Sequence, residues 1–88
     1  MAEPRMEPVG RVERFFGRPL VAVLELTAPL KLGDAIYIKG HTTDVQQAVD
    51  SLQVNHVPVQ EARPGDTVGL LVKTRCRKHD LIYKFVTD

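Results

Sequence analysis

The chain has 88 residues, enough for one small domain and too few for a catalytic domain with a separate regulatory one. Its 43% hydrophobic and 26% charged residues are typical of a globular domain and exclude a disordered chain. With 12 basic and 11 acidic side chains, the formal net charge of +1 excludes a polycation but leaves room for a local basic surface.

The beginning of the chain and its cysteine content bear on its location. Residues 1–7 contain acids and prolines where a secretory signal has a basic start and an apolar run, so we predict a disordered lead-in to a domain over residues 8–88. The apolar stretch Leu20–Leu24 is far shorter than the roughly 20 residues that cross a membrane. Cys76 has no second cysteine to pair with, which favours a reducing, cytoplasmic location.

The first half of the chain predicts a hairpin. β-Branched and aromatic residues favour strands over 8–16 and 20–26, with a break at 17–19. Alternation places Phe16 on the same face as Val12, so we expect Phe16 in the core, while Phe15 is left undetermined.

A four-residue pattern recurs before three further predicted strands, at 35–39, 67–73 and 81–86. Each copy has a base, a spacer, Gly or His, and then Asp: Lys31–Asp34, Arg63–Asp66 and Arg77–Asp80. Such a corner suits a type II turn, whose third residue needs a positive φ. His79 occupies that third position in the last copy, and His is among the non-glycine residues enriched there.

The segment 44–52 is ambiguous from its local pattern. Val45, Val49 and Leu52 have helical spacing behind a possible N-cap at Thr43 or Asp44. The pattern from Leu52 to Val59 instead has period two with a parity slip, as a β-bulge produces, and Pro58 requires an edge or a strand end. Six strand candidates in so short a chain favour a closed antiparallel barrel, which leaves no exposed edges.

Four segments in order along the chain resemble the second domain of elongation factor Tu and related translational GTPases. They are Gly10–Arg14, Leu30–Ile38, Val49–Leu52 and Ala62–Leu70, the last similar to the family's A-x-x-G-D-x-V-G-[IL] element. The chain also resembles small free-standing elongation-factor-like barrels and the barrel appended to collagenase-like peptidases. The resemblance implies a six-stranded antiparallel barrel with a strand over 44–52, and binding to RNA, ribosome or protein surfaces without chemistry. The glycine usual in the family is replaced by His79.

Catalytic and cofactor signals are weak. The chain has no G-x-x-x-x-G-K-[ST] loop, so we expect no bound nucleotide and no GTPase half, and its His and Cys residues lack metal-ligand spacing. Cys76 lies between Arg75 and Arg77, which would activate a thiol beside His79. On an extended chain, however, Cys76 points away from both arginines and into the core. We therefore expect neither an enzyme nor a cofactor.

The strongest binding signal is a basic run near the C-terminus. Lys73, Arg75 and Arg77 on an extended chain project to one side about 6.5–7 Å apart, a spacing that suits successive phosphates, and Lys78 follows. The alternative is a solvated strand face that protects an edge from aggregation.

Two other groups are candidates for binding. Arg11, Arg14 and Arg18 accompany the two phenylalanines of the hairpin, a combination suited to base stacking. The loop Lys39–Asp44 offers Lys39, His41, Thr42 and Thr43, although ordinary turn chemistry explains these residues equally well. The sequence thus predicts a module that binds RNA or a ribonucleoprotein through a basic strand face. The alternative is a protein-interaction module that docks onto an enzyme or translation factor supplied in trans.

Overall fold

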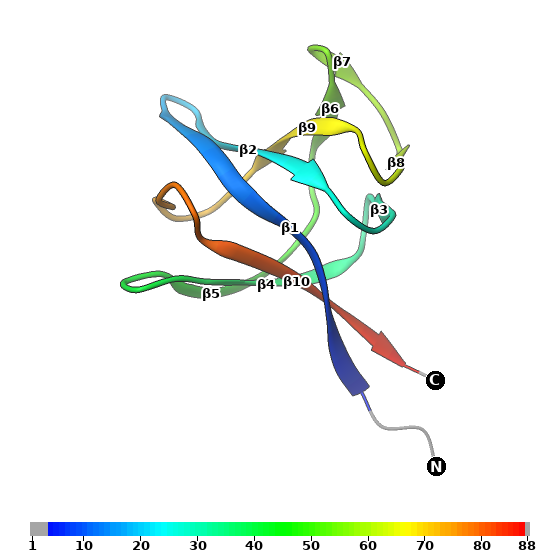
Figure 1. Cartoon of the computed structure of the whole chain (residues 1–88). Helices are drawn as coiled ribbons and strands as arrows, with labels where there is room; N and C mark the ends of the chain where they lie inside the picture. Colours follow the sequence, from blue (N-terminus) through cyan, green and yellow to red (C-terminus); the bar gives the residue numbers. More distant parts are fainter. Residues whose placement is uncertain (1–3, 88) are drawn as a thin grey trace.

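The computed structural model describes residues 4–87, which contain no helix and therefore no helix that could span a bilayer (Figure 1). The predicted all-β fold is confirmed. The strands are β1 (Pro4–Gly17), β2 (Leu20–Leu26), β3 (Leu30–Lys31), β4 (Ala35–Lys39), β5 (Asp44–Ala48), β6 (Leu52–Val54), β7 (Val57–Pro58), β8 (Glu61–Ala62), β9 (Thr67–Leu71) and β10 (Leu81–Thr87).

Eight strands form one antiparallel sheet in the order β5-β4-β10-β1-β2-β9-β6-β7, and β3 pairs with β8 separately. β5 at one edge is followed in the chain by β6 near the other edge, and only residues 49–51 connect them. The sheet thus curls into a barrel, divided into more strand segments than the six expected.

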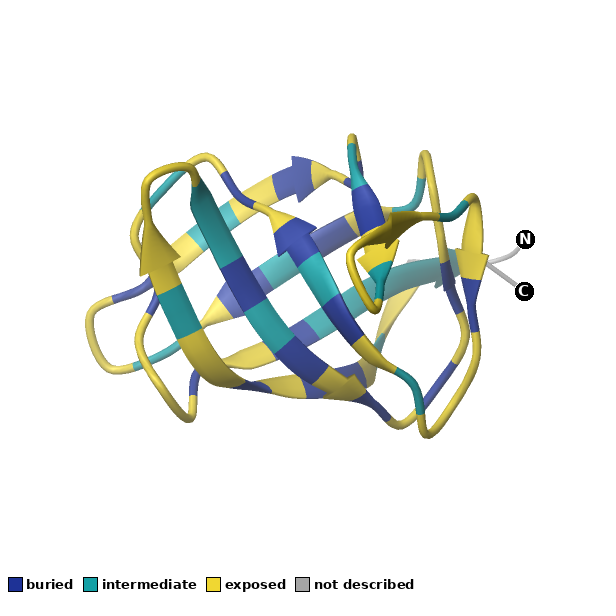
Figure 2. Cartoon of the chain, turned by 90° about the horizontal axis from the view of Figure 1, so that it is seen from above, coloured by how far each residue is buried: buried dark blue, intermediate teal, exposed yellow. Residues whose placement is uncertain are grey.

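The barrel interior is filled by the alternate residues of its strands. Burial alternates along β2 and β4, where Leu24, Ile36 and Ile38 are inaccessible to solvent while Glu25 and Lys39 are exposed (Figure 2). This period-two alternation is what a sheet with one face in the core requires. The largest fully buried side chains are Leu24, Leu26, Leu30, Ile36, Ile38, Leu52, Leu70, Ile82, Val9, Val12, Val49 and Val68.

The three predicted corners have the same hydrogen bonds. In each, the backbone N–H of the first residue donates to Oδ2 of the Asp, and the Asp N–H donates to the first residue's carbonyl. The side-chain bonds measure 3.0 Å at Lys31–Asp34, 3.0 Å at Arg63–Asp66 and 2.8 Å at Arg77–Asp80. The third residues have the positive φ values predicted: 90° at Gly33, 93° at Gly65 and 79° at His79.

The ambiguous segment is extended, as the resemblance implied. Residues 44–48 form β5 against β4, and 52–54 form β6 against β9. Pro58 lies in β7 at the edge of the sheet, where its missing N–H costs no ladder bond. Of the predicted lead-in, residues 1–3 lie outside the described part of the chain. The structure differs from the prediction at residues 4–7, which belong to β1 and pair with β10.

The expectation for Phe16 is wrong. The pairing of β1 with β2 shifts between Val12 and Arg14, so Glu13 is the extra residue of a bulge and reverses the parity that follows. Phe15 consequently packs against the core, while Phe16 is 53% exposed.

Candidate nucleic-acid interface

Three chain connections lie at one end of the barrel, the end opposite the strand termini Pro4 and Thr87 (Figure 1). They are residues 18–19 between β1 and β2, 40–43 between β4 and β5, and 72–80 between β9 and β10. Because neighbouring strands are antiparallel, these connections lie at a common end. The predicted site residues all belong to them or adjoin them, except Arg11 and Arg14 on the side of β1.

The basic run 73–78 is an irregular loop, which corrects the prediction of a basic strand face. β9 ends at Leu71, where the side chain of Gln47 replaces a partner strand: its Nε2 donates to the Leu71 carbonyl at 3.0 Å, and its Oε1 accepts from the Lys73 N–H at 2.8 Å. The basic side chains of the loop nevertheless remain on the surface: Lys73, Arg75, Arg77 and Lys78.

Cys76 anchors the middle of this loop in the interior. Its side chain is buried, as predicted, and the thiol donates to the Thr74 carbonyl at 3.7 Å. Burial, with a smaller contribution from the charge of Asp80, raises the pKa of Cys76 to about 11. The thiol is therefore neutral near pH 7, and the flanking arginines do not activate it.

Arg75 connects the loop to the first hairpin. Its guanidinium carbon lies 5.8 Å from the centre of the Phe15 ring, a cation–π distance, and the same side chain passes close to Gly17. The contact holds Arg75 over the end of β1.

The corner Arg77–Asp80 joins two basic clusters that are distant in sequence. The N–H of His79 donates to the Val12 carbonyl at 2.7 Å, and the Val12 N–H donates to the Asp80 carbonyl at 2.8 Å. These bonds bring Lys78 to the bulge of β1. A shallow hollow of about 280 Å³ results, lined by Arg11, Val12, Glu13, Arg14, Lys78 and His79.

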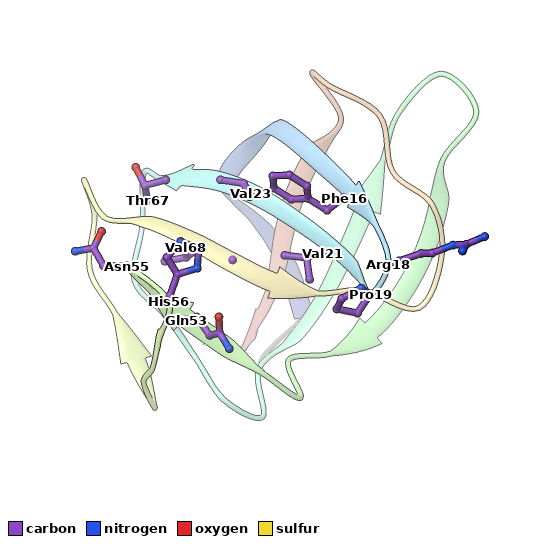
Figure 3. Close-up of a pocket in the computed structure, with 11 residues that line it drawn as sticks. Phe16, Arg18, Pro19, Val21, Val23, Gln53, Asn55, His56, Thr67 and Val68 are labelled. Atoms are coloured by element: carbon purple, nitrogen blue, oxygen red, sulfur yellow. The ribbon is translucent and has the colours of Figure 1, made fainter.

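Arg18 is separated from that hollow. It borders a larger, mostly apolar groove of about 450 Å³, in which Phe16, Val21 and Val23 lie close together (Figure 3). The Arg18 side chain extends away from these three (Figure 3). The other lining residues are Pro19, Gln53, Asn55, His56, Thr67, Val68 and Gly69.

The connection 40–43 packs against the corner, because the Asp80 carboxylate occupies the space beside Gly40. Thr43 is buried, so its hydroxyl is not a surface group. Its carbonyl accepts the Gly40 N–H at 2.7 Å. Of the loop candidates, Lys39, His41 and Thr42 are exposed.

Sequence reasoning missed an aromatic cluster on the outside of β4 and β10, formed by Tyr37, Tyr83 and Phe85. The sequence alternation predicts this cluster, because the three rings alternate along the strands with the buried Ile36, Ile38 and Ile82. Among residues 4–87, no group of three or more His, Cys, Asp or Glu side chains is placed to hold a metal ion.

Comparison with known proteins supports the resemblance. The chain is 41% identical over 76 residues to an uncharacterized protease of Methanocaldococcus jannaschii, covering 85% of this chain and 19% of that protein. It is 36% identical over 70 residues to elongation factor 1-alpha of Pyrococcus horikoshii, covering 75% of this chain and 13% of the factor. It is 34% identical over 79 residues to a collagenase of Porphyromonas gingivalis, covering 88% and 22% respectively. The chain thus spans at most about a fifth of the length of these relatives.

The fold has a close counterpart of similar size. The C-terminal domain of a putative U32 peptidase of Geobacillus thermoleovorans superposes with a TM-score of 0.81 at 18% identity, covering 86% of this chain and 96% of that domain. No protein-family model matches the chain. The chain is therefore a β-barrel similar to those of elongation factors and of U32 peptidase C-terminal domains, as its sequence predicted.

Proposed function

We propose that this barrel is a non-catalytic, cytoplasmic module that binds RNA or a ribonucleoprotein through its basic end. The supporting observation is the junction of two basic clusters: the corner Arg77–Asp80 is hydrogen-bonded to β1, so that Lys78 shares a hollow with Arg11 and Arg14. The neighbouring loop adds Lys73, Arg75 and Arg77, all exposed.

The binding mechanism is neutralisation of phosphates by positioned cations. The loop is fixed at three points, by Gln47, by the buried Cys76 and by the Asp80 corner, so little ordering accompanies binding. Release of counterions from the nucleic acid supplies the free energy, which makes the affinity depend on salt.

The absence of catalysis is inferred from the chemistry of the site. Cys76 is buried with a pKa raised to about 11, so it lacks the thiolate that nucleophilic catalysis needs. The structural counterpart is a C-terminal domain of a peptidase rather than a whole peptidase.

Fluorescence-monitored binding to total tRNA at 50 and 200 mM salt tests the proposal. If four cations contact phosphates of a single strand, affinity falls about 50-fold between the two salt concentrations. The double variant Arg75→Glu/Arg77→Glu is expected to weaken binding at least tenfold at low salt. Its control is Lys31→Glu/Arg63→Glu, which makes the same charge change on exposed residues at the first positions of the other two corners. Equal affinities of the two variants would contradict the proposal.

A protein-docking role is the second candidate, favoured by the apolar groove beside the exposed Phe16. It predicts recovery of a partner protein from lysate that persists after ribonuclease treatment and at high salt. Phe16→Asp should abolish that recovery, whereas Arg75→Glu/Arg77→Glu should not.

A further inference from the structure

An aromatic face covers the outside of the barrel where β10 pairs with β4. The Tyr37 and Tyr83 ring centres are 6.5 Å apart with planes inclined by 30°, and the Tyr37 and Phe85 centres are 6.5 Å apart at 41°. All three rings are partly exposed. We call Tyr37, Tyr83 and Phe85 the aromatic face.

The strand register explains why these rings point outward together. Tyr83 is directly opposite Tyr37, and the residues on either side of Tyr37, Ile36 and Ile38, are fully buried. Since successive side chains of a strand alternate between faces, the tyrosines are directed away from the core. Phe85 shares the parity of Tyr83 and lies one pleat further along β10.

Cations flank the aromatic face on the side nearest the basic end. Two residues before Tyr83, Leu81 pairs with Lys39 of β4 on one side and with Arg11 of β1 on the other. All three side chains are exposed. They form a row about 6.5–7 Å from the Tyr37–Tyr83 pair, which is two residues along a strand.

Two acidic residues adjoin this surface. Glu25 of β2 is exposed and lies opposite Arg11. The other is Asp44. It is opposite Lys39 on the edge strand β5 and accepts the hydroxyl hydrogen of Tyr37, which contributes most to the raised pKa of Tyr37. The Asp44 carboxylate is thus hydrogen-bonded to Tyr37 at the edge of the aromatic face, on the side of Tyr37 away from β10.

We infer that the aromatic face stacks the bases of single-stranded RNA, whose phosphates are contacted by Lys39 and Arg11. The inference rests on the proposed function and specifies its substrate class. Bases of a duplex are stacked on one another and cannot reach the rings, whereas unpaired bases present their flat faces to aromatic side chains. The two cations one pleat away, Lys39 and Arg11 on either side of Leu81, favour a phosphate-bearing partner over an uncharged protein surface.

The tyrosine content of the chain provides a direct readout. Its two tyrosines are Tyr37 and Tyr83, and it has no tryptophan, so intrinsic emission excited above the phenylalanine absorption reports the aromatic face alone. The protein is titrated with a single-stranded 12-nucleotide oligouridine and, separately, with a 12-base-pair RNA duplex. We expect the single strand to quench tyrosine emission and the duplex to bind without quenching.

A matched pair of variants completes the test. Phe85→Leu keeps apolar bulk while removing a ring of the face, and it should weaken single-strand binding about tenfold and leave duplex binding unchanged. Phe16→Leu, which removes an exposed ring elsewhere, should change neither. Thermal midpoints of both variants verify folding.

The possible failures are distinguishable. Salt-dependent RNA binding with unchanged tyrosine emission, or with equal affinity of the wild type and Phe85→Leu for the single strand, overturns the inference and preserves the proposed function. Failure of both RNAs to bind at 50 mM salt overturns the proposed function itself.

Discussion

The carboxylate of Asp80 fills the space that a side chain on Gly40 would occupy. Asp80 is buried, and its Oδ2 also accepts the Arg77 N–H at 2.8 Å. A single side chain therefore determines both the form of the third corner and the position of the neighbouring connection 40–43.

Adding a methyl group at Gly40 should damage the fold. In Gly40→Ala the new Cβ would collide with the Asp80 carboxylate, which is enclosed and already hydrogen-bonded, so we expect a loss of about 1–3 kcal/mol in the free energy of unfolding. Urea denaturation measures the change. Gly17→Ala is the control, because its Cβ would meet only the end of the Arg75 side chain, at 3.6 Å. Similar losses in both variants would be inconsistent with this close approach.

Gln47 should stabilise the barrel and its basic loop together. Removing the amide in Gln47→Ala leaves the Lys73 N–H without its acceptor, so we expect about 1–3 kcal/mol of destabilisation. Hydrogen exchange at the Lys73 amide should accelerate. The exposed neighbour Gln46→Ala is expected to leave both unchanged, and unaltered exchange in Gln47→Ala would refute the role assigned to this side chain.

His79→Gly should raise stability. The residue has a φ of 79°, a conformation that strains a side-chain-bearing residue and that glycine adopts freely. The relief exceeds the added flexibility of the unfolded chain by about 0.3–1 kcal/mol, which corresponds to about 2–6 °C in thermal midpoint. Gly65→His, the reverse change at the equivalent position, should lower the midpoint. An unchanged or lower midpoint for His79→Gly would argue against strain at this corner.

The buried thiol should make stability fall in alkaline solution. Burial raises the pKa of Cys76 from 9.0 to about 11, so between these pH values the folded state retains a proton that the unfolded state has lost. The free energy of unfolding then decreases as pH rises from about 9 through 11, and the contribution is constant below that range. Cys76→Ala lacks this contribution, so its stability should decline less steeply. Parallel curves for the two proteins would disprove the assignment.

The sequence predicted the corners correctly because their causes are local. A positive φ at the third residue and an Asp at the fourth suffice to close each turn, whatever the rest of the chain does. The strands 20–26 and 35–39 were also predicted correctly, the first from its β-branched residues and the second from the corner that precedes it.

The errors concern features that depend on a partner strand. Glu13 is recognised as an inserted residue only from the register of β1 against β2. A prediction that ignores the insertion assigns Phe15 and Phe16 to the wrong faces of the strand. Residues 73–77 were expected to be extended, but no neighbouring strand pairs with them. At Leu71, where β9 ends, the side chain of Gln47 bonds the backbone instead. The meeting of Lys78 with Arg11 and Arg14 likewise follows from pairing between distant segments.

The pairing of Pro4 with Thr87 has a practical consequence. The two ends of the described part of the chain thus lie together, at the end of the barrel opposite the cationic loops (Figure 1). An affinity tag, a dye or a solid support attached at either end would leave the proposed RNA-binding loops unobstructed. Surface-tethered binding measurements should therefore give the same affinities whichever end carries the tether.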